Sequence, residues 1–282
     1  MGKAKNREKF ESGHHDMQMM QAPIINQVER EKLKGRSAEQ QKFINLIYES
    51  KIVVVSGPQG TGKTFPASVV AWDMFTNPNY AEQVTTITMI RPNEPLGSTM
   101  GFMKGDLYEK YKHWLAPIEE GILWRMEDGK QDLGSLIKAK NTYKDLINCE
   151  AITPTPVEHL RGRTWNKTFV IIDEAQNLSI EAMKCIMGRI GEDCKVVICG
   201  DVDQCDLPRP ELSGLRYLRD CYEYALERDM GRVPLRWVSL TETVRSYECD
   251  YFTRLFNEVD AQTTGDKIIP NAMDFRDNVV NK

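Results

Sequence analysis

A glycine-rich run at residues 57–64 constrains the fold of this chain more than any other feature of its sequence. It has the spacing G-x-x-x-x-G-K-[ST], and the β-branched residues 52–55 come directly before it. Glycines allow the backbone to curl until successive N–H groups point inward, and the positive end of a following helix adds to this anion-binding nest. The run therefore predicts a buried strand, a phosphate-binding loop and a helix in direct succession.

The residue types of the loop also predict its ligands, which are ATP and Mg²⁺. Lys63 is expected to reach the β- and γ-phosphates, and Thr64 to offer its hydroxyl to the metal. Pro66 is compatible with the helix because it falls in or near the first turn, where its missing N–H costs little. The predicted nucleotide-binding residues of the loop are Gly57, Pro58, Gln59, Gly60, Thr61, Gly62, Lys63 and Thr64.

Short apolar runs alternate with helical stretches along the chain, and the helical stretches include 179–190 and 211–226. This alternation predicts an α/β fold in which helices cover both faces of a parallel sheet. Ser37 is a candidate N-cap for a helix that precedes the first strand. The expected strands are 52–55, 86–90, 169–172 and 196–199, with 235–240 as a fifth candidate.

The same patterns suggest how the chain is divided. Residues 1–34 are expected to form a flexible N-terminal segment, and 35–260 a P-loop ATPase domain. A helical insertion at about 106–148 breaks the alternation and is expected to pack on one edge of the sheet. Residues 261–282 are expected to form a loosely held C-terminal tail.

Two acids end the apolar run 169–172, as in a Walker B segment. Asp173 is expected to help hold Mg²⁺, and Glu174 to act as the general base toward the attacking water. Because the carboxyl ends of parallel strands face the ligand crevice, both acids should meet the phosphate loop. Gln204 follows the next strand and is a candidate sensor of the γ-phosphate, with Asp201 fixing its loop. The alternatives are two solvated acids at the start of a helix and an ordinary turn.

The overall composition narrows the setting of this chemistry. The net charge of −4 gives no global attraction to nucleic acid, although it leaves room for a local basic groove. The seven cysteines show no metal-ligand spacing and are expected to be buried, reduced thiols. No apolar run is long enough to cross a membrane, and the N-terminus lacks the pattern of a secretory signal. A cytoplasmic protein is therefore expected.

Several motifs together resemble the PhoH family, the phosphate-starvation-type ATPases related to superfamily 1 helicases. The resemblance covers roughly residues 35–252. The Arg-Gly-Arg-Thr run that precedes the Asp-Glu-Ala-Gln-Asn run is its most specific element. The motifs that carry it are 35–40, 57–64, Arg91-Pro92, 101–107, 161–164, 173–177, 200–208 and 213–215. Gln59, Ser98 and Ser246 depart from the family pattern, which affects nucleotide sensing more than ATP binding.

The resemblance implies a RecA-like core and adds roles for particular residues. Gln40 is expected to read the edge of adenine, since a side-chain amide can pair with its donor and acceptor. Arg245 is a candidate arginine finger that would stabilise charge on the γ-phosphate in the transition state. Arg161 and Arg163 compete for that role or for nucleic-acid phosphates. RNA cleavage, which fused nuclease domains perform in some relatives, is not expected.

One RecA-like lobe leaves the γ-phosphate side of the site open, so a neighbouring subunit is expected to close it. The resemblance implies a homo-oligomeric ring, with a hexamer as the expected form, that couples ATP hydrolysis to RNA or single-stranded DNA. Trp165, Phe102 and Lys104 would, with the arginines at 161 and 163, contact the nucleic acid. The alternatives are a nucleotide-gated binding module and an ATPase that acts on a protein partner through residues 114–124.

Overall fold

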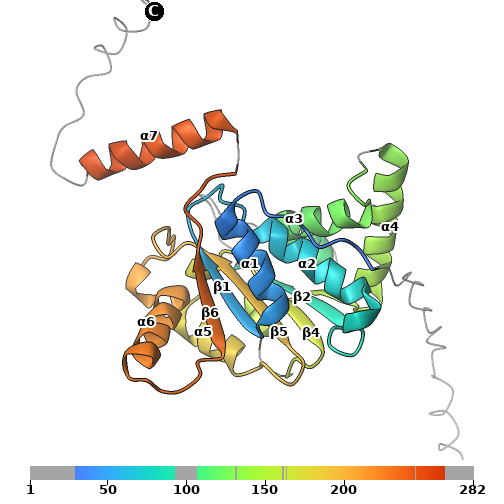
Figure 1. Cartoon of the computed structure of the whole chain (residues 1–282), viewed down its shortest axis with the longest axis horizontal. Helices are drawn as coiled ribbons and strands as arrows, with labels where there is room; N and C mark the ends of the chain where they lie inside the picture. Colours follow the sequence, from blue (N-terminus) through green and yellow to red (C-terminus); the bar gives the residue numbers. More distant parts are fainter. Residues whose placement is uncertain are drawn as a thin grey trace, which may run out of the picture.

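The computed structural model describes residues 29–92, 107–130, 132–160, 162, 164–244 and 246–263. Its centre is a six-stranded sheet in the order β3-β2-β4-β5-β1-β6, and every paired strand is parallel to its neighbour (Figure 1). The strands are β1 (Ile52–Ser56), β2 (Thr86–Ile90), β3 (Ile152–Pro154), β4 (Thr168–Ile172), β5 (Lys195–Gly200) and β6 (Leu235–Ser239). The predicted α/β fold with a parallel sheet is confirmed, and so are the five expected strands.

Helices cover both faces of the sheet. The α-helices are α1 (Ala38–Glu49), α2 (Thr64–Thr76), α3 (Leu107–Met126), α4 (Leu133–Asn148), α5 (Ile180–Met187), α6 (Gly214–Glu227) and α7 (Tyr247–Thr263). Short 3-10 helices occupy Pro78–Tyr80, Val157–His159, Ala175–Asn177 and Pro210–Leu212. The side chain of Ser37 accepts a hydrogen bond from the backbone N–H of Gln40, which confirms the predicted N-cap of α1.

The core has two layers because successive residues of a strand point to opposite faces. Val53 and Val55 of β1 join the layer formed with α1, α2, α3 and α4, while Ile52 and Val54 join the layer formed with α5 and α6. All five residues of β1 are buried, as in a strand covered on both sides. The central strands of the sheet are therefore covered on both faces and support the loops that follow them.

One strand and one α-helix were not predicted. The three-residue strand β3 pairs with β2 at one edge of the sheet, and α4 packs beside it. Helix α7 follows β6 at the opposite edge, extends past the expected domain end at residue 260, and stands apart from the sheet and its covering helices in Figure 1. Among the described residues, no helix combines the length and apolarity that crossing a bilayer requires.

Candidate nucleotide-binding site

The carboxyl ends of β1, β2, β4 and β5 lie side by side along the carboxyl-terminal end of the sheet and define the site. Ser56 is in register with Gly200, and Ile90 with Ile172. The backbone N–H of Gly57 donates to Gly200 at 3.2 Å, and that of Asp173 donates to Ile90 at 2.9 Å. The pairing of parallel strands thus places the phosphate loop, the two acids and the loops after β2 and β5 together, as expected for a ligand crevice.

The phosphate loop needs glycine at two positions for different reasons. Gly62 has a φ of +73°, and a Cβ there would lie 2.5 Å from Gln40 Nε2. Gly57 is constrained by proximity, because a Cβ there would lie 2.2 Å from the backbone oxygen of Leu240. Gly62 therefore shapes the curl of the loop, and Gly57 lets the loop leave β1 against the end of β6.

The side chain of Lys63 folds back on the phosphate loop of which it is part. Its ammonium donates to the backbone oxygens of Gly57 at 2.6 Å and of Pro58 at 2.9 Å. Helix α2 begins at Thr64, and Pro66 occupies its first turn, as predicted. The positive charge and the N-terminus of the helix are thus directed at one small region, which suits an anion.

The donor set expected for a divalent cation lies beside this region. The hydroxyl of Thr64 donates to Asp173 Oδ1 at 2.6 Å, and Arg91 Nη1 lies 2.7 Å from Asp173 Oδ2. Burial raises the pKa of Asp173 above its ordinary value and Glu174 adds to the rise, whereas Arg91 and the hydroxyl of Thr64 oppose it. A hydroxyl and a buried carboxylate are ligands of the hard type that Mg²⁺ prefers, so these residues fit the metal.

Glu174 is held between two partners. Arg91 Nη2 lies 3.4 Å from one carboxylate oxygen, and Gln176 Nε2 donates to the other at 2.7 Å. The backbone of Glu174 is left-handed, with φ 50° and ψ 43°, which turns the chain sharply after β4. Gln176 also accepts from the backbone N–H of Asp201 at 3.0 Å, so one buried amide joins the loops after β4 and β5.

Gln40 is buried beside the loop. Its oxygen accepts from the backbone N–H of Arg36 at 2.8 Å, and its nitrogen is 3.4 Å from the oxygen of Thr61 and 3.3 Å from that of Gly62. An amide oxygen accepts two hydrogen bonds and an amide nitrogen donates two. Gln40 therefore connects the start of α1 to the phosphate loop.

A cavity of about 820 Å³ joins these groups and extends toward α3. Phe65 and Trp124 line it and form an edge-to-face pair with ring centroids 5.3 Å apart. The residue next to Trp124, Arg125, forms an ion pair with Asp73 of α2 at 2.6 Å, which anchors this part of α3. The cavity thus has a polar end at the acids and the loop, and an aromatic wall between α2 and α3, a form suited to a nucleotide.

Residues 241–244 cross the other side of the loop, and we call them the 241–244 segment. The backbone N–H of Val244 donates to Gly60 at 3.0 Å, and the backbone N–H and hydroxyl of Thr241 donate to Glu39 at 2.6 and 2.8 Å. These bonds lower the pKa of Glu39. Arg36 Nη1 donates to the oxygen of Val244 at 3.2 Å. The segment that leads to α7 is therefore attached to both the loop and α1.

The structure gathers some sequence-predicted residues and separates others. The loop residues, Asp173, Glu174 and Gln40 come together. Gln204 is exposed after β5 and does not line the cavity. Trp165 is half-buried and packs against the α5–α6 core layer. The remaining predicted residues Arg161, Arg163, Arg245, Phe102, Lys104 and Ser98 lie outside the described residues.

Sequence reasoning missed several residues of the site. Arg91 entered only as part of a family motif, yet it contacts both acids. Gln176 likewise appeared only within a motif. The aromatic pair of Phe65 and Trp124 and the contacts of Glu39 had no signal in the sequence, because each joins segments distant in the chain.

A family model described as PhoH-like protein matches residues 32–255. The chain belongs to the PhoH family. A PhoH-like protein of Mycobacterium tuberculosis is 34% identical over 191 residues, which are 68% of this chain and 50% of that protein. One of Synechocystis is 30% identical over 240 residues, 82% of this chain and 67% of that protein. Protein PhoH of Escherichia coli is 29% identical over 181 residues, 64% and 47% of the two chains.

The chain spans about half the length of the mycobacterial relative. Among solved structures, the Pif1 helicase of Candida albicans is 15% identical, with a TM-score of 0.40 over 80% of this chain and 44% of that chain. The DEAD-box helicase Mss116, bound to ssRNA and UDP-BeF, is 11% identical, with a TM-score of 0.38 over 80% and 48% of the two chains. Family membership and the loop geometry make this PhoH-like chain a P-loop nucleotide-binding protein.

Proposed function

We propose that this PhoH-like protein binds ATP with Mg²⁺ and hydrolyses it, and that RNA or single-stranded DNA stimulates the hydrolysis. The observation that carries the proposal is the 2.6 Å hydrogen bond between Thr64 and Asp173, beside the Lys63 ammonium. It joins a hydroxyl and a carboxylate from segments 109 residues apart at the start of the helix that follows the loop. Such a pair is what a magnesium–triphosphate site requires.

The chain's own groups can divide the work. Lys63 would exchange its bonds to two backbone oxygens for bonds to the phosphates, and Thr64 and Asp173 would hold the metal. Mg²⁺, when bound, supplies positive charge that offsets the charge of the phosphate oxygens. Glu174 would accept a proton from the attacking water at a carboxylate oxygen, while Gln176 keeps that carboxylate oriented.

Other parts of the site concern recognition. The oxygen of Gln40 accepts one hydrogen bond, from Arg36, and could accept a second from adenine. Its nitrogen could donate to adenine in exchange for one of its two long bonds to the loop. Phe65 and Trp124 provide an apolar surface for the base. Gln204 and Arg245 remain proposals, the first as a sensor of the γ-phosphate and the second as an arginine finger supplied by a neighbouring subunit. Arg161 and Arg163 remain alternatives for that role or for contacting nucleic-acid phosphates.

Because the arginine finger would come from a neighbouring subunit, the proposed assembly is a homo-oligomeric ring such as a hexamer. All seven cysteines are free thiols, which supports a reducing compartment and hence the cytoplasm.

A second candidate function is a nucleotide-gated binding module, favoured by the bonds between the 241–244 segment and the phosphate loop. Slow turnover that nucleic acid does not stimulate would support this module over a nucleic-acid-stimulated ATPase.

The test is phosphate release from ATP with and without single-stranded RNA, together with equilibrium binding of ATP. Replacing Glu174 by Gln should lower kcat by roughly 100-fold or more while ATP binding persists, since a general base contributes on the order of 10²–10⁴ in rate. Lys63→Ala should weaken ATP binding itself. Glu181→Gln, an equal change in the first turn of α5, is the matched control. Unchanged turnover in Glu174→Gln would disprove the assigned mechanism.

A further inference from the structure

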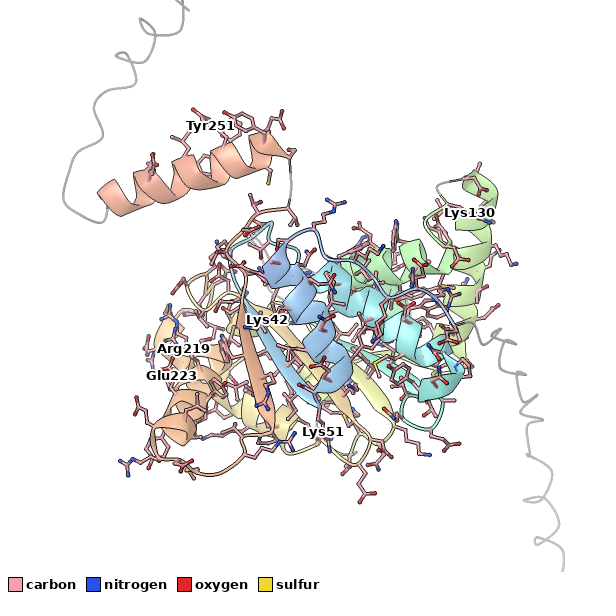
Figure 2. The ribbon with its side chains drawn as sticks, viewed as in Figure 1. Lys42, Lys51, Lys130, Arg219, Glu223 and Tyr251 are labelled. Atoms are coloured by element: carbon pink, nitrogen blue, oxygen red, sulfur yellow. The ribbon has the colours of Figure 1, made fainter. Side chains whose placement is uncertain are left out.

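Helix α7 presents a largely apolar face to solvent. Five large apolar side chains recur at positions one, five, six, nine and ten of the helix, so they share one side. They are Tyr247, Tyr251, Phe252, Leu255 and Phe256, with 77%, 50%, 51%, 37% and 60% of their surfaces exposed. Neighbouring rings lie 5.5 to 6.2 Å apart, so the aromatic members form one patch. Tyr251 projects from α7 away from the sheet (Figure 2). Contiguous exposed apolar patches of this kind mark interaction sites.

The charges of α7 narrow the choice of partner. The helix carries four acidic residues, Glu248, Asp250, Glu258 and Asp260, against the single basic residue Arg254. Glu248 falls within the apolar face, and Glu258 lies in line with Tyr247, three turns further along. Two such helices would bring like charges together, which disfavours pairing of α7 with itself. The expected partner surface is apolar and basic.

Helix α4 offers such a surface. Leu133 and Ile137 are 73% and 52% exposed, and Lys140 and Lys144 continue the same stripe along the exposed side of the helix. With Lys138, α4 has three exposed lysines and a single acidic residue, Asp145. The two helices have 16 and 17 residues, or about 25 Å each, so they match in length.

The two surfaces lie at opposite edges of the sheet. Helix α7 follows β6, the strand at one edge, and α4 packs beside β3, the strand at the other. The 241–244 segment is bonded to the phosphate loop, and only residues 245 and 246 separate it from the start of α7. Figures 1 and 2 show α7 and α4, with Lys130 near the start of α4, on well-separated sides of the molecule. Complementary surfaces at opposite edges meet between copies rather than within one chain.

We infer that α7 of one copy docks by its apolar, acidic face on α4 of the next copy. This contact is heterologous, so its repetition gives a closed ring or an open filament. The inference rests on the proposed oligomer and identifies the helices that form it. In each copy the 241–244 segment connects the phosphate loop to α7, so the docked helix is linked through the chain to the nucleotide-binding site.

The experiment measures the mass of the full chain by analytical ultracentrifugation without nucleotide. The donor variant is Phe252→Asp with Phe256→Asp, and the acceptor variant is Leu133→Asp with Ile137→Asp. The matched control is Leu226→Asp with Met230→Asp, two exposed apolar residues on and just after α6, with 55% and 67% of their surfaces accessible. The native chain and the control should assemble, whereas each interface variant should dissociate with an apparent Kd raised roughly 30-fold or more.

Mixing the two interface variants gives the decisive result. The donor variant keeps α4 and the acceptor variant keeps α7, so an equal mixture should form pairs of one copy each and stop there. Pairing in the mixture also shows that both variants are folded. The inference is overturned if the native chain sediments as a single copy, if the acceptor variant assembles like the native chain, or if the mixture stays as single copies. Because no ATP is present, an assembled chain that fails to hydrolyse ATP would disprove the proposed ATPase and leave this contact standing.

Discussion

Replacing Arg91 by methionine tests how much the ion pair with Asp173 stabilises the fold, and whether a bound metal can take the place of Arg91. In the described structure the Asp173 side chain is 3% exposed and that of Arg91 is 21% exposed, and their nitrogen and oxygen lie 2.7 Å apart. Removing one member of a buried ion pair costs about 3–5 kcal/mol, because the other charge stays buried without its partner. Arg91 is partly hydrated and Thr64 still donates to Asp173, so we expect a loss of about 2–3 kcal/mol.

That loss should appear as a lower melting temperature. A change of 1 kcal/mol shifts the melting temperature of a domain of this size by roughly 2–4 °C, so Arg91→Met should melt about 5–10 °C lower in the presence of a chelator. With saturating Mg²⁺ and a non-hydrolysable ATP analogue, most of the difference between the variant and the native chain should vanish. The reason is that a divalent cation beside Asp173 would supply the missing positive charge.

Calorimetry of the native chain, Arg91→Met and the control Arg236→Met measures these shifts. Arg236 is an exposed arginine in β6, so its replacement should change the melting temperature little. Adding Asp173→Asn to Arg91→Met should restore part of the stability without ligand, since a neutral amide needs no counter-charge. An Arg91→Met chain that melts like the native chain, or that loses as much stability with Mg²⁺ and nucleotide as without, would refute the reasoning.

Two further predictions test other parts of the fold. Gly57→Ala should lower the unfolding free energy by about 1–3 kcal/mol, because its Cβ would meet a backbone oxygen at 2.2 Å. The control Gly188→Ala should not, because its Cβ would find its nearest neighbour at 3.4 Å. Equal midpoints of urea unfolding for the two variants would contradict this. Burial raises the pKa of Cys194 to about 11 and that of Cys199 well above its ordinary value. At pH 8 both thiols should therefore stay protonated and resist iodoacetamide while exposed Cys221 reacts, as peptide mass spectrometry would show; labelling of Cys199 as fast as Cys221 in the folded chain would contradict it.

Strands β1, β2, β4 and β5 were predictable because each is a short, β-branched or apolar run that is buried almost throughout. The phosphate loop and the acid pair were predictable because their chemistry depends on neighbouring residues in the chain. In contrast, β3 has three residues and ends at Pro154, so its pattern is too short to distinguish from a loop. It forms because β2 offers a free edge, which is a tertiary effect.

The missed residues of the site depend on tertiary contacts as well. Arg91 meets Asp173 only because β2 and β4 pair with Ile90 in register with Ile172. Trp124 reaches Phe65 across the packing of α3 on α2. Helix α7 is a different case, since its apolar spacing is present in the sequence. From the sequence we expect only the end of a domain and a tail there, because nothing in the chain indicates where such a face would be buried.

The attachment of the 241–244 segment gives the phosphate loop a mechanical connection to α7. Gly60 accepts hydrogen bonds from the backbone of Val244 and, at 3.4 Å, from the hydroxyl of Thr243. Val244 also lines the cavity, so a nucleotide in the cavity would contact this residue directly. Any shift of the loop around a triphosphate must either carry the segment with it or break these bonds. Since α7 begins three residues after Val244, a shift of the loop that carries the segment with it would also move the start of α7.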